Sequence, residues 1–377
     1  MLSRLRKWAW VLPLLFAACT PPPPQANTTP EEAATGTQSA LLEVQAEIQN
    51  LLAELDRIFS GSFTGLGLSA GALEPLAQPG RWLTHPFGLL ARPLDLVPLA
   101  TQGLPRGQFQ CQAGNCSSTG SSDDLVIRYR AQETDPWNKA LADWDYSTKG
   151  SSSPTVEAHL PGNTSDTNEV PTKAFFALDL GDDGSNQGEA TLSARWRPST
   201  CLPGKYLTEP ESLRLQGFLD HPTGTARLVD LRTLEFTSSN TQVGLSWDLA
   251  LNVTGNESAL ATRGGVTVNG SANPGTCGSL METFSPTGGS LDVELSTRTH
   301  SLHLAFQVPR VEENPTRIHV QNGYLTVDGK TVTFDGILDD ENGNCVPGEN
   351  LTLRFANNQT MTLEAFLIQH MDARPCP

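Results

Sequence analysis

The chain has 377 residues, with 25 Lys and Arg against 41 Asp and Glu, which gives a formal net charge of −16 at pH 7. A nucleic-acid binder needs clustered Lys and Arg side chains for its phosphate contacts, so this balance excludes nucleic acid as a partner. The same acidity argues against adsorption to anionic lipid through surface charge alone.

The N-terminus combines a basic segment, an apolar segment and a cysteine. Arg4, Arg6 and Lys7 precede an apolar stretch, residues 8–16, that is too short to stay in a bilayer as a spanning helix. Phe16-Ala17-Ala18-Cys19 then follows. It resembles the lipobox of bacterial lipoproteins, Leu-[Ala/Ser]-[Gly/Ala]-Cys, with phenylalanine in the leucine place. The alternatives are a plain secretory signal cut elsewhere and an uncleaved anchor.

The lipoprotein resemblance implies a signal peptide over residues 1–18 and a mature chain that begins at Cys19. It also implies a diacylglycerol and an acyl chain on Cys19, and a protein held outside the cytoplasm on a bacterial membrane. Cleavage would leave 25 − 3 = 22 basic residues against 41 acidic ones. We recognise no family in the rest of the sequence.

A tether and a helix are expected next. Residues 19–38 are rich in Pro, Thr, Ala and Glu and poor in large apolar residues, which predicts a disordered tether. Residues 39–61 predict an amphipathic helix, because apolar residues recur at spacings of three and four. The helix either packs on its own β-domain or, through residues 39–60, mediates self-association or contact with a partner helix. The recurring apolar residues are Leu41, Val44, Ile48, Leu51, Leu55 and Ile58.

Residues 62–106 are rich in Leu, Pro and Gly and carry few charges. Six prolines between Pro75 and Pro105 exclude long regular elements. We expect this segment to line or cap the β-domain; a lipid-facing or ligand-lining role is the alternative.

Residues 107–377 predict a mainly β fold, either a large antiparallel sandwich or a curled meander. Short apolar–polar alternations such as 125–130, 243–253 and 301–308 are separated by Gly, Asn, Asp and Pro turns. Crossover helices are missing from the pattern, which argues against a parallel sheet. A similar order of strand, acidic loop, Gly-Glu and strand occurs in 173–196 and 330–355, so two β-units, about 107–220 and 221–377, are considered.

Six cysteines follow Cys19, and an even number outside the cytoplasm predicts up to three disulfides. Fifteen connectivities are open. The pairing Cys111–Cys116, Cys201–Cys277 and Cys345–Cys376 is the simplest set of neighbours.

One acidic loop resembles the Asp-x-Asn-x-Asn calcium loops of EF-hand-like and bacterial surface repeats. Calcium prefers six to eight oxygens, which alternate side chains in a tight loop can supply. The resemblance implies side-chain oxygens, one main-chain carbonyl and a closing carboxylate as ligands. In this order they are Asp340, Asn342, Asn344, Val346 and Glu349. Cys345 stands where the family has glycine, and a plain polar turn is the alternative. Asp182, Asp183 and Glu189 form a weaker candidate.

These features favour a membrane-anchored extracytoplasmic lipoprotein with a non-enzymatic role, either in binding or in envelope structure. Two other classes stay open: a carrier for an apolar ligand in a curled sheet, and a hydrolase. The carrier requires an apolar cavity, whereas the hydrolase requires several polar groups that converge in one pocket.

Overall fold

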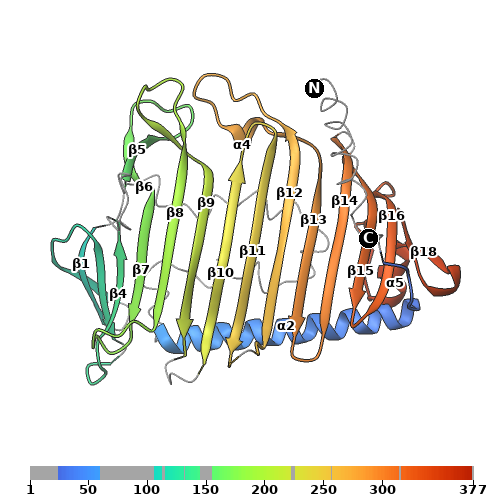
Figure 1. Ribbon diagram of the computed structural model, residues 1–377, viewed down its shortest axis with the longest axis horizontal. Coiled ribbons are helices and arrows are strands. Elements are labelled where there is room, and N and C mark those ends of the chain that lie inside the picture. The colour runs from blue at the N-terminus through green and yellow to red at the C-terminus, as the bar shows by residue number, and fades with distance from the viewer. Residues whose placement is uncertain are drawn as a thin grey trace, which may run out of the picture.

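The computed structural model describes residues 24–59, 106–112, 115–130, 132–144, 155–221, 226–255, 257–313 and 316–375. They form one large, mostly antiparallel β-sheet, with a long helix running across one end of its strands (Figure 1). The expected signal peptide, Cys19, residues 62–105 of the Leu/Pro/Gly-rich segment and Cys376 lie outside the described residues.

The sheet has eighteen strands. In chain order they are β1 (Gly107–Gln112), β2 (Asn115–Gly120), β3 (Leu125–Arg130), β4 (Asn138–Asp143), β5 (Thr155–His159), β6 (Thr167–Pro171), β7 (Lys173–Asp179), β8 (Gly188–Pro198), β9 (Tyr206–Asp220), β10 (Arg227–Ser238), β11 (Gln242–Val253), β12 (Leu260–Ser271), β13 (Ser285–Thr297), β14 (Ser301–Glu313), β15 (Thr316–Val327), β16 (Lys330–Leu338), β17 (Asn350–Arg354) and β18 (Thr360–Thr362). The described helices are α2 (Pro30–Phe59), α4 (Leu280–Thr283), the 3-10 turn η5 (Ala356–Asn358) and α5 (Leu363–His370).

The strand order is that of a meander. From β7 to β18 each strand pairs antiparallel with the next one in the chain. Before it, β3 and β4 continue the sheet from β7, while β1 lies parallel to β3 and antiparallel to β2. The β5–β6 hairpin joins through a short parallel pairing of β5 with β9. The expectation of a mainly β, antiparallel fold is confirmed, and the meander describes its connectivity.

Local sequence chemistry explains several of these elements. Asp328 and Gly329 adopt φ angles of 50° and 77°, the two positive values that a tight two-residue hairpin turn between β15 and β16 needs. The alternation of apolar and polar residues also predicts a strand over 361–366; this prediction is wrong beyond Thr362, because α5 begins at Leu363. The Thr362 side chain caps this helix by accepting a hydrogen bond from the Ala365 N–H.

The sheet is continuous across residues 220 and 221, the boundary between the two β-units that the sequence suggested. Strands β9 and β10 form a hairpin in which Asp220 pairs with Arg227. The two similar sequence segments are both hairpins, β7–β8 and β16–β17, so the similarity corresponds to a shared local structure.

Helix α2 begins at Pro30, nine residues before the expected start at Ser39, so the expected tether over 19–38 is corrected from Pro30 onward. Thr29 and Glu32 form a capping box. The Thr29 hydroxyl accepts the Glu32 N–H at 3.3 Å, and the Glu32 carboxylate accepts the Thr29 N–H at 3.2 Å. Pro30 occupies the first helical position, where its missing N–H costs nothing.

One face of α2 is buried against the sheet. Ala33 and Ala34 pack in a cluster with Phe334 and Leu353, Val44 with Leu251 and Leu260, and Ile58 with Leu178. The 26 residues from Ala33 to Ile58 span about 38 Å, close to the about 43 Å of nine strand spacings from β7 to β16. The helix therefore crosses most of the meander, and the seam residues in these clusters face their own sheet. Association through residues 39–60 stays a prediction.

Acidic side chains of α2 bond to the turns at the ends of the strands. Glu43 accepts hydrogen bonds from the hydroxyls of Thr297 and Thr299 at 2.5 and 2.6 Å, and these bonds lower the pKa of Glu43. Glu54 lies 3.1 Å from His221. These contacts fix the position of the helix along the ends of the strands. Burial of its apolar face alone would not specify that position.

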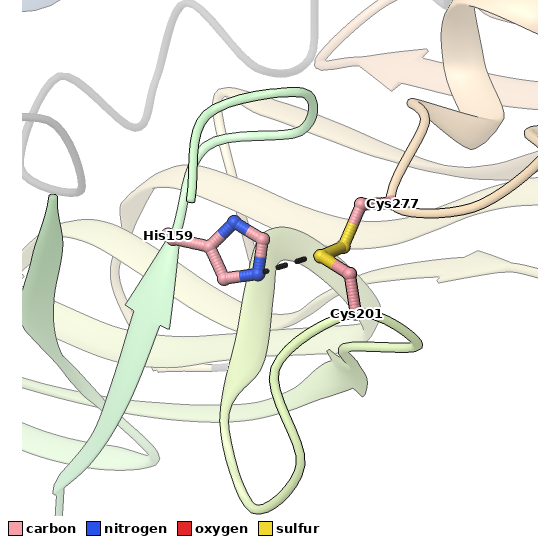
Figure 2. Close-up of side chains that lie close together, drawn as sticks. All are labelled: His159, Cys201 and Cys277. Atoms are coloured by element: carbon pink, nitrogen blue, oxygen red, sulfur yellow. Dashed lines mark hydrogen bonds between the residues drawn. A yellow bond between two sulfur atoms is a disulfide. The ribbon is translucent and has the colours of Figure 1, made fainter. Parts of the chain in front are cut away.

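The predicted disulfide Cys201–Cys277 is confirmed, with a Cα–Cα distance of 5.6 Å (Figure 2). Cys111 and Cys345 are also disulfide-bonded, and Cys111 lies opposite Cys116 in the β1–β2 register. Within the described residues, no helix is both long and apolar enough to span a bilayer.

Candidate functional site

The two faces of the meander differ in chemistry because side chains alternate along each strand. One cross-strand row over β11–β14 consists of Leu245, Val266, Leu291 and Phe306. A row on the opposite face consists of Asp248, Arg263, Glu294 and His303. The apolar face is the one on which α2 lies, since Leu304 and Phe306 pack both on this row and on the cluster that holds Ala33.

An apolar cavity of about 150 Å³ lies on this inner face, between α2, α5 and strands β13–β17. Its walls come from distant parts of the chain. They are Ala33, Thr37, Leu291, Leu304, Phe306, Val320, Leu325, Val332, Phe334, Leu338, Pro347, Leu351, Leu353, Leu363, Phe366, Leu367 and Met371.

Among the described residues that line the cavity, Thr37 is the one with a polar side chain. Its hydroxyl donates a 2.7 Å hydrogen bond to the carbonyl oxygen of Ala33, one turn earlier in the same helix. The hydroxyl is therefore satisfied within α2, and its methyl group is left for the cavity. An apolar cavity of this size stays dry and takes apolar molecules, because water inside it would lack hydrogen-bond partners.

Small residues of α2 allow its close approach to the sheet at this end. A Cβ on Gly36 would lie 3.3 Å from a methyl carbon of Val327, tighter than an ordinary van der Waals contact. Ala33, Ala34 and Ala40 are 5%, 4% and 0% exposed. The helix that bounds the cavity therefore lies close to the sheet. Phe306 and Leu304, which line the cavity, remain half-buried.

The predicted calcium loop is adjacent to this cavity through Pro347. Within the loop, Asp340 accepts the Cys345 N–H at 3.1 Å, and Asn344 accepts the Val346 N–H at 2.8 Å. Glu349 accepts the Asn342 N–H at 2.8 Å through Oε1, whereas its buried Oε2 has no hydrogen-bond partner.

Sequence reasoning missed Glu364 of α5, whose carboxylate accepts the side-chain amides of Asn342 and Asn344 at 2.9 and 2.5 Å. The loop therefore ties α5 to the sheet. Calcium binding by Asp340, Asn342, Asn344, Val346 and Glu349 stays a prediction.

The residues of the weaker candidate have separate partners. Asp182 pairs with Arg128 at 3.0 Å, and Glu189 accepts the side-chain amide of Asn186 at 3.0 Å. Asp183 accepts the Ser185 hydroxyl and N–H, and these hydrogen bonds lower its pKa. Asp179, missed in the sequence, organises the turn from inside by accepting the N–H groups of Asp183 and Gly184.

A second constellation joins His159 to the Cys201–Cys277 disulfide. All three ligand atoms, one from each residue, lie within 4.8 Å of one another, and this is the one group of at least three His, Cys, Asp or Glu side chains in the described ranges with that property. Sequence spacing gave no signal for it, since the three residues are far apart in the chain: His159 ends β5, and the two cysteines lie in separate loops (Figure 2).

Comparisons with known proteins leave these sites without a precedent: no family model, no curated protein and no solved structure matches the chain.

Proposed function

We propose that this chain is a lipid-anchored extracytoplasmic protein that binds a small apolar ligand, about the size of benzene, on the inner face of its sheet. The observation that supports the proposal is the cavity between α2, α5 and β13–β17, whose described lining residues are apolar except for one satisfied threonine. Ligand-binding cavities of soluble domains are lined mostly by such side chains.

The chemistry of the lining favours binding over catalysis. Among the described residues that form it there is no carboxylate, imidazole, thiol or amine, and the Thr37 hydroxyl is already bonded to a main-chain carbonyl. General acid–base catalysis requires such groups within reach of the substrate. A purely structural envelope role is the competing interpretation, and it predicts no saturable binding.

Calorimetric titration with benzene tests the proposal on the mature chain in detergent-free buffer, because a cavity of about 150 Å³ admits a ligand of that size. We expect saturable binding with one site per chain. Leu304→Trp should weaken binding at least about tenfold, because the larger ring fills a wall of the cavity, a loss of about 1.4 kcal/mol.

Gln307→Trp is the matched control, because Gln307 lies exposed three residues away on the outer face of the same strand. Circular dichroism of both variants checks that the sheet persists. A titration without saturation, or equal affinity of the Leu304→Trp and wild-type chains, would contradict the proposal.

The membrane attachment has its own test at Cys19. We expect the intact mass of the membrane-bound chain to correspond to a start at Cys19 plus a diacylglycerol and an acyl chain. Cys19→Ala should then release the protein, because each buried CH₂ of an anchor contributes about 0.8 kcal/mol. Full membrane partition of Cys19→Ala would refute the anchor.

A further inference from the structure

His159 is fully buried at the end of β5, and its hydrogen bonds define which ring nitrogen carries the proton. Nδ1 lies 2.9 Å from the carbonyl oxygen of Leu160 and 2.8 Å from that of Asn163. Carbonyl oxygens only accept, so Nδ1 is the protonated nitrogen. In the neutral ring, Nε2 therefore carries the lone pair, and it accepts the Ser199 hydroxyl.

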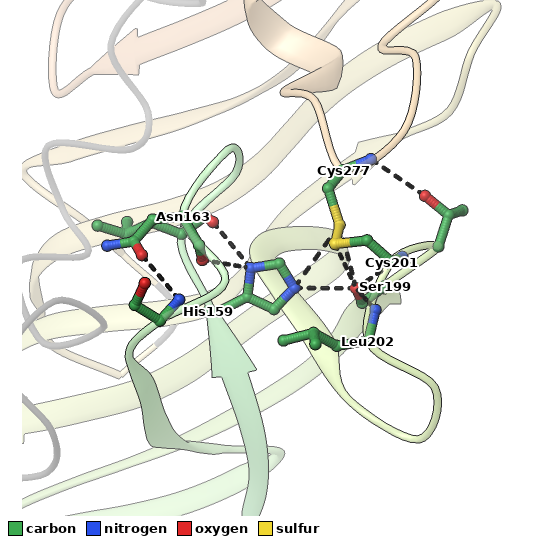
Figure 3. Close-up of a disulfide and its surroundings, with 9 residues drawn as sticks. His159, Asn163, Ser199, Cys201, Leu202 and Cys277 are labelled. Atoms are coloured by element: carbon green, nitrogen blue, oxygen red, sulfur yellow. Dashed lines mark hydrogen bonds between the residues drawn. A yellow bond between two sulfur atoms is a disulfide. The ribbon is translucent and has the colours of Figure 1, made fainter.

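That lone pair points toward Ser199 and the two sulfur atoms (Figure 3). Nε2 lies 2.9 Å from the Ser199 hydroxyl and 3.9 Å from Sγ of Cys277. Ser199 Oγ is in turn 3.6 and 3.4 Å from the sulfurs of Cys201 and Cys277. A histidine whose second nitrogen donates to a main-chain carbonyl is the usual arrangement of a metal ligand.

Hydrogen bonds other than the disulfide hold these loops together. Gly162 N–H donates to the carbonyl of Cys277 at 2.7 Å, and Cys277 N–H donates to the Thr200 hydroxyl at 3.1 Å. Ser199 Oγ accepts the N–H groups of Cys201 and Leu202 at 3.3 and 3.0 Å. The three loops thus have contacts that remain when the sulfur–sulfur bond is opened.

We propose that Cys201, Cys277 and His159 form a zinc site when the disulfide is reduced. A dithiol reductant supplies two electrons and two protons, the Cys201–Cys277 bond breaks, and the reductant becomes a disulfide. Each cysteine thiol then loses its proton to solvent as Zn²⁺ binds. Two thiolates and a neutral imidazole bring the formal charge of the centre to zero, which suits a buried position.

The distances are close to those that zinc requires. With Zn–S of about 2.3 Å and Zn–N of about 2.0 Å, tetrahedral ligands lie roughly 3.5–3.8 Å apart. The distance between His159 Nε2 and Cys277 Sγ is already 3.9 Å. The sulfurs must separate by about 1.7 Å from bonding distance, which side-chain rotation can supply. Ser199 Oγ or water completes the four ligands.

Cobalt and zinc titrations of the full chain test this site before and after dithiol reduction, with the reductant removed under inert gas. We expect the reduced wild-type chain to bind one Zn²⁺ more than the reduced Cys201→Ser/Cys277→Ser chain, and Co²⁺ to give a thiolate-to-metal charge-transfer band. His159→Gln should lose at least about tenfold in affinity while it keeps all cysteines.

Cys201→Ser/Cys277→Ser is the second variant, and it retains any zinc that the other reduced cysteines bind. Equal stoichiometry in this variant and the reduced wild type would overturn the proposal, as would unchanged affinity in His159→Gln. Loss of the β-sheet circular dichroism on reduction would overturn it too, because the site requires loops that stay in place without the disulfide.

Discussion

Val44→Asp is expected to lower the free energy of unfolding by about 3 kcal/mol and to loosen α2 from the sheet. Val44 is 3% exposed and packs against Leu251 and Leu260, which are 2% and 4% exposed. The substitution removes apolar burial of about 1.5 kcal/mol and introduces a carboxylate at a buried position that packs against leucine side chains.

Leu42→Asp is the matched control, because Leu42 lies two residues away on the same helix and is 66% exposed. A surface substitution of this kind changes stability by about 0.5 kcal/mol or less. Urea denaturation measures the free energy of unfolding of both variants. The fluorescence of an apolar dye reports whether the inner face of the sheet becomes exposed when α2 loosens. Equal destabilisation by the two substitutions would show that α2 does not depend on this contact.

The position of α2 illustrates what the sequence could predict. The apolar spacing from Leu41 to Ile58 predicted the helix and its buried side. The first turns were missed because their buried residues are small: Ala33, Ala34, Thr37 and Ala40 carry little apolar signal. The capping box of Thr29 and Glu32 was readable from the sequence and marks the true start.

The candidate sites depend on the tertiary arrangement, so they were harder to predict from the sequence than the strands. Alternation predicted most strands of the meander, and the Cys201–Cys277 pair occurs in three of the fifteen connectivities that six cysteines allow. The cavity, however, combines residues from Ala33 to Met371, so its walls follow from strand register and helix placement together. His159 meets the disulfide across 118 residues of sequence, a contact that no local pattern encodes.

Glu209→Ala is expected to cost about 3–5 kcal/mol of unfolding free energy, the range for removing one partner of a buried ion pair. Glu209 is 5% exposed and accepts hydrogen bonds from the Ser279 hydroxyl and, at 2.9 Å, from the Leu280 N–H. Its other neighbour is Arg197, whose Nε lies 3.7 Å away and whose side chain is 15% exposed. The variant would leave a buried guanidinium without its carboxylate.

Glu211→Ala is the control, since Glu211 pairs with Arg195 on the same two strands at 2.7 Å, but the Arg195 side chain is 78% exposed. Exposed pairs contribute about 1 kcal/mol or less. The two variants are compared by the midpoints of their urea unfolding curves, provided that the dependence of the unfolding free energy on urea concentration is the same in both. A loss below about 1 kcal/mol in Glu209→Ala would mean that solvent reaches Arg197 and replaces the carboxylate.

Glu209 also holds the segment that follows Cys277, so its loss should affect the Cys201–Cys277 disulfide as well as the free energy of unfolding. Ser279, the N-cap of α4, lies two residues after Cys277, and its hydroxyl bonds both to Glu209 and to the Glu282 N–H. Loss of the carboxylate should free this segment, because α4 has only four residues and depends on its cap. We therefore expect a dithiol to reduce Cys201–Cys277 faster in Glu209→Ala than in Glu211→Ala, measured by thiol alkylation and peptide mapping. Equal rates would mean that the loop hydrogen bonds from Gly162 and Thr200 hold Cys277 without help from Glu209.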